Sequence, residues 1–93
     1  MNNKAKGSRW ELSIKKMLEN TGYQCTKAGG SLGVFDLVCF RKNEVRLIQA
    51  KCNYCPPTEI ETIKEFPLDK EIKTQKEVWI KKDRIKEPII KIY

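Results

Sequence analysis

Three polar residues interrupt two neighbouring apolar segments of the chain: Asp36 lies in the segment 34–41, and Gln49 and Lys51 lie in the segment 45–51. Both segments are rich in β-branched and aromatic residues, which predicts strands. A hairpin between them brings Asp36 beside the end of the second strand, because Asp36 lies about six residues before the turn and Gln49 about five after it. A carboxylate, an amide and an ammonium group are therefore expected to meet at one edge of a sheet.

This set of groups suits metal-assisted hydrolysis of phosphodiester bonds. Mg²⁺ prefers oxygen ligands and keeps several of its waters, and we expect Mn²⁺ to substitute for it. The expected ligands are oxygens of Asp36, Gln49 and the Ala50 carbonyl, with Glu11 from a helix packed on the sheet as a second negative ligand. The metal would polarise the phosphate and acidify a water. Lys51 would orient that water and offset charge in the transition state.

Composition narrows the possible chemistry further. The 93 residues contain no histidine, which excludes imidazole-dependent nucleophiles, histidine-ligated zinc and histidine acid–base catalysis. Nineteen Lys and Arg residues against twelve Asp and Glu residues give a net charge of +7, which points to a polyanionic partner. The alternative is that the basic composition only favours solubility.

Hydropathy gives no sign of a membrane partner. No apolar run approaches the roughly 18–20 residues that span a bilayer, and the polar N-terminus lacks the apolar segment of a signal peptide. We therefore expect one domain, residues 1–93, in the cytoplasm, where thiols stay reduced. Cys52 and Cys55 form a CxxC pair, for which a zinc or redox role is the weaker alternative, whereas Cys25 and Cys39 are expected to be small core residues.

The first helix is predicted over residues 8–20. Ser8 is expected to cap it, with Glu11 as capping-box partner, and Gly22 is expected to stop it. Its apolar face is expected to comprise Trp10, Ile14, Met17 and Leu18.

The remaining elements form a small mixed sheet flanked by helices, in the order α-β-β-β-α-β-β. A second helix is predicted over 58–66, capped by Thr58 and ended by Pro67, and a three-residue turn over 42–44. Residues 68–75 contain two lysines and two acidic residues and have no clear secondary structure. The later charged residues either extend a basic surface or form a solvated face; they include Lys70, Lys73, Lys76, Glu77, Lys81, Lys82, Arg84 and Lys86. Strands are predicted over 23–27, 34–41, 45–51, 76–82 and 88–93.

This D…(D/E)xK arrangement resembles the PD-(D/E)xK nuclease superfamily, and in particular archaeal Holliday junction resolvases and related small phage and virus endonucleases. The resemblance spans residues 6–52. Its motifs are Lys6-Gly7-Ser8-Arg9 with Glu11, Gly22-Tyr23, Ala28-Gly29-Gly30-Ser31, Phe35-Asp36-Leu37-Val38 and Leu47-Ile48-Gln49-Ala50-Lys51.

The resemblance implies a restriction-endonuclease-like core and a metal-dependent endonuclease that acts on branched or duplex DNA. It implies that Ser31 contacts the scissile phosphate and that the first helix begins beside the site. Basic residues there and the glycine loop would grip the DNA backbone; we assign Lys4, Lys6, Arg9, Lys27 and Gly30 to this role. Symmetric cutting of a junction needs two sites, so a homodimer is expected.

One residue departs from the family pattern. Gln49 stands where the family usually has Glu or Asp, so the site loses one negative charge. A DNA-binding protein with the same fold and weak or no catalysis is therefore the alternative function.

Overall fold

The computed structural model describes residues 3–28, 34–68 and 73–93. The predicted order of helices and strands is confirmed. The elements are α1 (Asn3–Glu19), β1 (Gln24–Lys27), β2 (Leu37–Arg41), β3 (Glu44–Cys52), α2 (Pro57–Glu65), β4 (Lys73–Lys81) and β5 (Ile89–Ile92).

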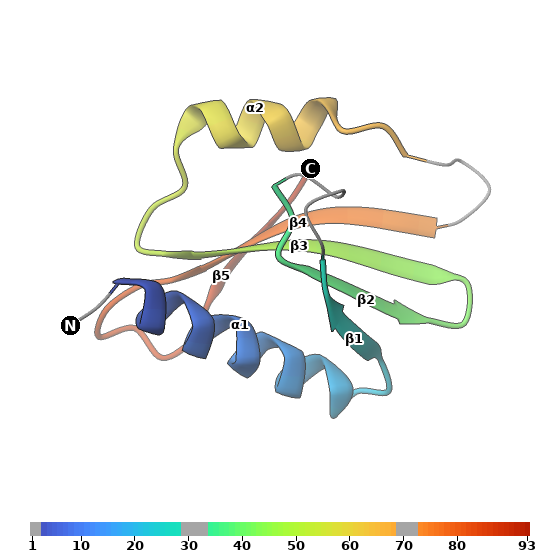
Figure 1. The fold of residues 1–93 in the computed structure, drawn as a ribbon, viewed down its shortest axis with the longest axis horizontal. Coiled ribbons are helices and arrows are strands. Elements are labelled where there is room, and N and C mark those ends of the chain that lie inside the picture. The colour runs from blue at the N-terminus through green and yellow to red at the C-terminus, as the bar shows by residue number, and fades with distance from the viewer. Residues whose placement is uncertain (1–2, 29–33, 69–72) are drawn as a thin grey trace.

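The five strands form one mixed sheet in the order β1-β2-β3-β4-β5. Strands β3 and β4 are parallel and are joined through α2, whereas the other neighbouring pairs are antiparallel. Helix α1 covers one face of the sheet and α2 the opposite face (Figure 1). The carboxyl ends of β3 and β4 therefore lie at the same end of the molecule, beside the first turn of α2.

The core beneath α1 is built on two tryptophans. Trp10, Ile14 and Leu18 of the helix pack with Ile48 and Trp79 of the sheet. The indole Nε1 of Trp10 donates a hydrogen bond to the Trp79 carbonyl, at 3.0 Å, and so fixes the helix on β4.

The predicted apolar face of α1 needs one correction. Met17 was expected on it, but its side chain is 39% exposed. Three buried residues at spacings of four, Trp10, Ile14 and Leu18, already span the contact with the sheet, and Met17 lies outside that row.

The core beneath α2 is separate and contains no tryptophan. Phe35, Leu47, Ile63 and Val78 are buried there, and the Phe35 ring meets the Phe66 ring edge-on at 5.1 Å between centroids. The sequence of β3 also predicts that successive side chains alternate between the two faces of the sheet. The structure agrees, because Leu47 packs in this core while its neighbour Ile48 packs beneath α1.

Both predicted N-caps are wrong. Helix α1 begins at Asn3, so Ser8 lies inside the helix and cannot form a capping box with Glu11. Lysine and alanine in the preceding segment are good helix formers and extend the helix toward the N-terminus. Helix α2 has Pro56 as its N-cap, with no side-chain capping bond, because Pro57 already favours the first helical position and Thr58 follows inside the helix.

The predicted end of α2 and the predicted hairpin turn each change by one residue. Helix α2 ends at Glu65 rather than at residue 66, and still before Pro67. In the β2–β3 hairpin Arg41 pairs with Glu44, so the turn has two residues rather than the three expected, with Lys42 in the left-handed region at φ 52°. Gly22 follows the end of α1 at φ 94°, as its role as a helix stop requires.

Two charged residues that were expected on a solvated or DNA-facing surface are buried. Glu77 is 0% exposed, and its two carboxylate oxygens accept hydrogen bonds from Arg46 at 2.7 Å each. The Trp79 indole donates to the same carboxylate at 2.9 Å. Lys76 donates from Nζ to the carbonyls of Lys64 and Phe66, at 2.6 and 3.2 Å, and so satisfies acceptors at the end of α2.

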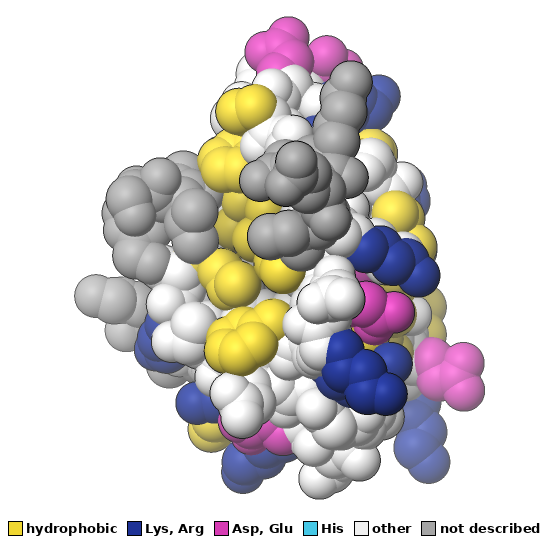
Figure 2. All heavy atoms as spheres, turned by 90° about the vertical axis from the view of Figure 1, so that its right-hand side faces the viewer, with side chains coloured by type: hydrophobic (Ala, Val, Ile, Leu, Met, Phe, Trp, Pro, Cys, Tyr) yellow, Lys and Arg dark blue, Asp and Glu magenta, His cyan; other side chains and the backbone are white. Residues whose placement is uncertain are grey.

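The end of the molecule that carries the β2–β3 turn combines basic and acidic side chains. Figure 2 views this end, and basic side chains there lie next to acidic ones. Glu44 lies 3.5 Å from both Arg41 and Lys73 and accepts a hydrogen bond from the Tyr23 hydroxyl at 3.1 Å. The Arg41 guanidinium stacks over the Tyr23 ring at 4.4 Å. These basic groups therefore have partners within the protein. In the described residues, neither helix combines the length and apolar character that crossing a bilayer requires.

Candidate active site

The hairpin brings Asp36 to the end of β3, as the residue count predicted. Asp36 lies just before β2, and its N–H donates to the Ile48 carbonyl at 2.8 Å. The N–H of Ala50 then donates to Asp36 Oδ2 at 2.9 Å, where a backbone carbonyl would continue the ladder. In a strand, the N–H and the C=O of one residue point toward the same neighbouring strand. The Ala50 carbonyl therefore faces the Asp36 side of β3, as its N–H does.

Gln49 links the aspartate to the lysine. Its side chain is 6% exposed. The amide is oriented so that its nitrogen faces two acceptors and its oxygen faces a donor. The nitrogen donates to Asp36 Oδ2 at 2.7 Å and to the Val34 carbonyl, and the oxygen accepts from Lys51 Nζ at 3.3 Å. The amide therefore places its nitrogen on the aspartate and its oxygen on the lysine.

Glu59 is a site residue that the sequence analysis missed. Its Oε2 lies 2.6 Å from Lys51 Nζ, and both side chains are partly exposed. A sequence signal was present: Glu59 lies in the first turn of α2, where a carboxylate is favourable, and this helix starts shortly after the strand that ends with Lys51. Nothing in the spacing alone identified which acidic residue of that helix faces the lysine.

The pKa values of both candidate carboxylate ligands are raised. Burial is the main cause that raises the pKa of Asp36, and Glu59 adds to it, whereas the Ala50 N–H and Lys51 lower it. Burial also raises the pKa of Glu11, and Asp36 raises it further against the opposing charge of Lys27. Glu11 of α1 and Asp36 thus lie within electrostatic reach of each other, in a region where a cation would stabilise both charges.

The oxygen groups of this region fit a hard divalent cation. Asp36, Glu11 and the Ala50 carbonyl are oxygen donors of the kind that Mg²⁺ takes, and Mg²⁺ needs few protein ligands because it keeps waters. Within residues 3–28, 34–68 and 73–93, no group of three or more His, Cys, Asp or Glu side chains could hold a metal. A metal here would therefore depend on the carbonyl and amide oxygens as well as on the carboxylates.

Four of the five predicted DNA-binding residues lie in the part of the chain that the structure describes. Lys4 and Lys6 belong to α1, Arg9 is exposed on the same helix, and Lys27 ends β1. Ser31 and Gly30 lie outside the described residues.

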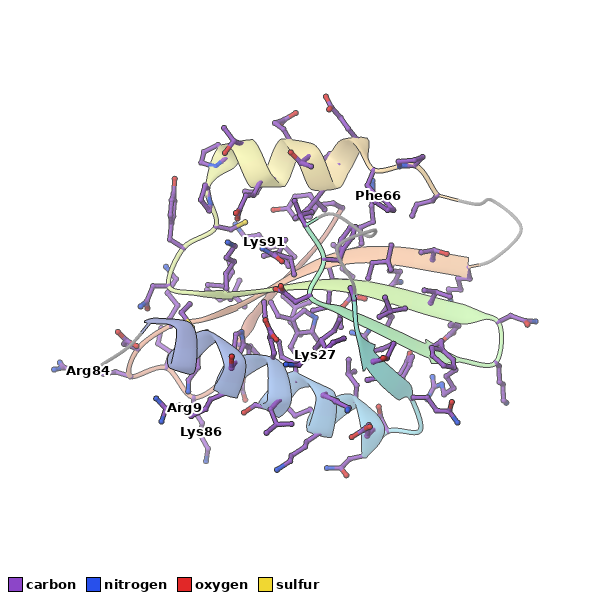
Figure 3. The ribbon with its side chains drawn as sticks, in the orientation of Figure 1. Arg9, Lys27, Phe66, Arg84, Lys86 and Lys91 are labelled. Atoms are coloured by element: carbon purple, nitrogen blue, oxygen red, sulfur yellow. The ribbon has the colours of Figure 1, made fainter. Side chains whose placement is uncertain are left out.

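The structure places two further basic residues, whose role the sequence analysis left undecided. Arg84 and Lys86, in the connection between β4 and β5, lie at the same end of the molecule as Arg9 (Figure 3). Lys27 and Glu11 line a hollow of about 240 Å³ between α1 and the edge of the sheet. Arg9, Arg84 and Lys86 therefore gather at one end of the molecule, and Lys27 lies beside Glu11.

The four cysteines are free thiols. Cys39 is buried in the core beneath α1 and Cys25 lies opposite it in the β1–β2 ladder, in agreement with their expected core role. Cys55 is buried beneath α2, and Cys52 packs beneath α1. The CxxC pair is thus divided between the two faces of the sheet, which does not favour a shared metal.

Comparison with solved structures identifies the architecture. The fold is similar to that of a Holliday junction resolvase. One matching structure is Hjc of Archaeoglobus fulgidus, an archaeal hyperthermophile, with a TM-score of 0.70 and 19% sequence identity. The match covers 95% of this chain and 71% of that one. It confirms the restriction-endonuclease-like core that the sequence motifs implied. No protein-family model matches the chain, and no curated protein is similar to it in sequence.

Proposed function

We propose that this protein is a metal-dependent DNA endonuclease that cuts phosphodiester bonds in branched DNA. The observation that carries the proposal is the meeting of Asp36, Gln49, Ala50 and Lys51 at the open end of β3, on a resolvase-like nuclease fold. Fold alone does not determine function, so the proposal depends on this arrangement of side chains.

Asp36, Glu11 and the Ala50 carbonyl would hold Mg²⁺ or Mn²⁺. Gln49 would add an oxygen ligand only if its amide turned, because its nitrogen faces Asp36 and its oxygen faces Lys51. When bound, the metal would polarise the scissile phosphate and supply a reactive water. An ammonium group has three N–H donors, and Lys51 directs two of them to Gln49 and Glu59. The third donor has no partner among the described residues and would meet a phosphate oxygen or the attacking water, which places positive charge where negative charge develops.

Basic side chains around the site would hold the DNA backbone. Arg9 lies on α1, Lys27 ends β1, and Arg84 and Lys86 lie between β4 and β5. Contacts to phosphate position DNA without selecting sequence. If each of these four side chains meets one phosphate, log K should fall with log salt with a slope of about −3.6.

We also propose a homodimer. The outer edge of β5 pairs with no strand of the described residues, and Ile89, Ile90 and Ile92 are 37%, 43% and 61% exposed. An exposed apolar edge strand favours pairing with another chain. Sedimentation of the native chain and of Ile92→Lys tests this, and a native chain that is monomeric while cutting both strands of a junction would contradict it.

A specific observation favours the second candidate, a DNA-binding protein that does not cut. Gln49 is neutral, and its nitrogen already occupies Asp36 Oδ2, so the site holds less negative charge for a metal.

The two candidates are separated by one experiment. The protein is incubated with a four-way junction, a duplex and single-stranded DNA of matched sequence, in Mg²⁺, Mn²⁺ or EDTA. The endonuclease proposal expects metal-dependent cleavage, greatest on the junction, that Asp36→Asn abolishes and that Lys42→Ala, at the opposite end of the molecule, leaves unchanged. Binding to the junction without cleavage in either metal would support the second candidate.

A further inference from the structure

We propose that a hollow beside Lys51 binds an unpaired nucleotide, with its base stacked on Tyr54 and its phosphate held by Lys82 or Lys91. This inference rests on the proposed function and specifies its substrate: DNA in which a base next to the cleavage site is free to leave the helical stack.

The hollow lies next to the site, and two side chains connect them. It has a volume of about 310 Å³ and lies between the first turn of α2 and the sheet, with Cys55 and Ile60 in its wall. Cys55 Sγ lies 4.0 Å from Glu59 Oε2, and the same oxygen lies 2.6 Å from Lys51 Nζ. Cys55 and Glu59 therefore connect a ligand in the hollow to the lysine.

Tyr54 is an exposed aromatic side chain on a fixed backbone. It is 63% exposed, which leaves much of its ring available to a partner. The preceding residue, Asn53, donates from its N–H to the Lys81 carbonyl at 2.7 Å. The Asn53 side chain also exchanges two hydrogen bonds with Asp83, at 3.0 and 3.2 Å. These bonds tie the segment after the Lys51 strand to the end of β4, so the ring is presented without the entropy loss of ordering a loop.

The charge of the hollow selects an anion. Lys82 and Lys91 are the only charged residues in its described lining. Neither forms an ion pair with a carboxylate of the described residues. Lys91 points from β5 into the space between the sheet and α2 (Figure 3). The remaining walls include Ile60, Ile80 and Ile89, which are apolar.

A nucleotide combines the two features that such a hollow requires. Its base offers a flat face for stacking on an aromatic ring, and its phosphate offers the negative charge. A paired base in a duplex cannot reach a side chain in this way, because its faces are covered by neighbouring bases. The hollow therefore favours DNA with an unpaired base over a continuous duplex.

The test measures binding in EDTA, so that cleavage does not interfere. Two duplexes share one sequence, and one of them carries a single unpaired 2-aminopurine, whose fluorescence is quenched when it stacks. The variants are Tyr54→Ala and Tyr54→Phe, which keeps the ring. Circular dichroism establishes that both are folded, as expected for an exposed position.

We expect the native chain to bind the DNA with the unpaired base about tenfold more tightly than the continuous duplex, with quenching of the probe. Tyr54→Ala should lose this preference and the quenching, whereas Tyr54→Phe should keep both. Lys82→Gln with Lys91→Gln should weaken binding of the unpaired base more than binding of the duplex.

Equal effects of Tyr54→Ala on both DNAs, or no effect on either, would overturn the proposal. A change of Tyr54→Ala from dimer to monomer in sedimentation would also overturn it, because the hollow would then be an interface between copies. A native chain that shows the Tyr54-dependent preference but cuts no DNA in Mg²⁺ or Mn²⁺ would support this inference while contradicting the proposed endonuclease.

Discussion

Glu59 Oε2 lies 2.6 Å from Lys51 Nζ, so the first turn of α2 fixes the lysine at the end of β3. The lysine also approaches the Gln49 amide oxygen at 3.3 Å. Asp36, Gln49, Lys51 and Glu59 thus form one connected group, in which α2 acts on the site through Lys51.

Replacing Glu59 should change catalysis more than stability. Glu59→Gln removes the charge that holds Lys51, and we expect a 10- to 100-fold slower cleavage at saturating DNA, roughly the effect of a misplaced catalytic group. Because Glu59 helps to raise the pKa of Asp36, the acid limb of the pH–rate profile should move to lower pH. The partly exposed ion pair contributes only about 0–1 kcal/mol to folding.

The matched control is Glu61→Gln on the same helix, whose carboxylate lies 3.8 Å from Lys64 at the surface. It should alter neither the rate nor the pH profile. A Glu59→Gln variant with the native rate and profile would remove Glu59 from the site.

Asp36→Asn should stop cleavage while making the fold more stable at neutral pH. Burial raises the pKa of Asp36 in the folded chain, so the folded state binds the proton more tightly than the unfolded state does. Ionisation at neutral pH therefore opposes folding, and this penalty disappears as the pH falls below the ordinary pKa of an aspartate. Urea unfolding of the native chain and the variant should differ most near pH 7 and converge near pH 3–4.

Asp36→Ala provides the contrast to this prediction. It removes the acceptor of the Ala50 N–H, and an unsatisfied buried donor costs about 1–3 kcal/mol. Equal stability of the Asn and Ala variants would indicate that this hydrogen bond contributes nothing to the fold.

Gln49→Glu should make stability depend on metal. The native amide nitrogen donates to Asp36 Oδ2 and to the Val34 carbonyl. A carboxylate there faces two acceptors, so in EDTA we expect a loss of about 1–3 kcal/mol. A bound cation would relieve the repulsion, so Mg²⁺ should raise the melting temperature of the variant more than that of the native chain.

Gln49→Glu should also change the Mg²⁺ dependence of the cleavage rate. A gain of about 1–2 kcal/mol in metal binding would lower the Mg²⁺ midpoint of cleavage about 5- to 30-fold. Gln24→Glu makes the same charge change at an exposed position of β1 and should shift neither quantity. An equal response of both variants to Mg²⁺ would exclude Gln49 from the metal environment.

Glu77 should be the most sensitive charged residue for folding. It is fully buried, receives both Arg46 hydrogen bonds and accepts one from the Trp79 indole. Glu77→Ala leaves the Arg46 charge without its partner, and we expect a loss of about 3–5 kcal/mol in urea unfolding. The double variant Glu77→Leu with Arg46→Met should recover much of that loss, and a single variant that loses less than about 1 kcal/mol would contradict the role of the pair.

The sequence predicted those parts of the site that depend on local rules. Alternation along β3 separated Leu47 from Ile48, and the hairpin count brought Asp36 to Ala50. Both follow from the backbone geometry of two strands that are neighbours in the chain, which needs no knowledge of distant contacts.

The missed features depend on contacts between distant segments or on competition between local signals. Lys76 and Glu77 had the composition of a solvated face, and only the positions of Lys64 and Arg46 explain their burial. The capping signal at Ser8 was outweighed because the residues before it also favour helix. Glu59 could not be distinguished from other acidic residues of α2 until the crossover from β3 was placed.

The separation of the two cores determines what a fluorescence experiment on this protein can detect. Trp10 and Trp79 both belong to the layer beneath α1, with ring centroids 6.4 Å apart, and the core beneath α2 contains neither. Indole emission will therefore report the docking of α1 and remain largely insensitive to the detachment of α2, which carries Glu59. Far-ultraviolet dichroism reports both helices, so a difference between its midpoint and that of the indole signal would show that the α2 side of the sheet opens separately.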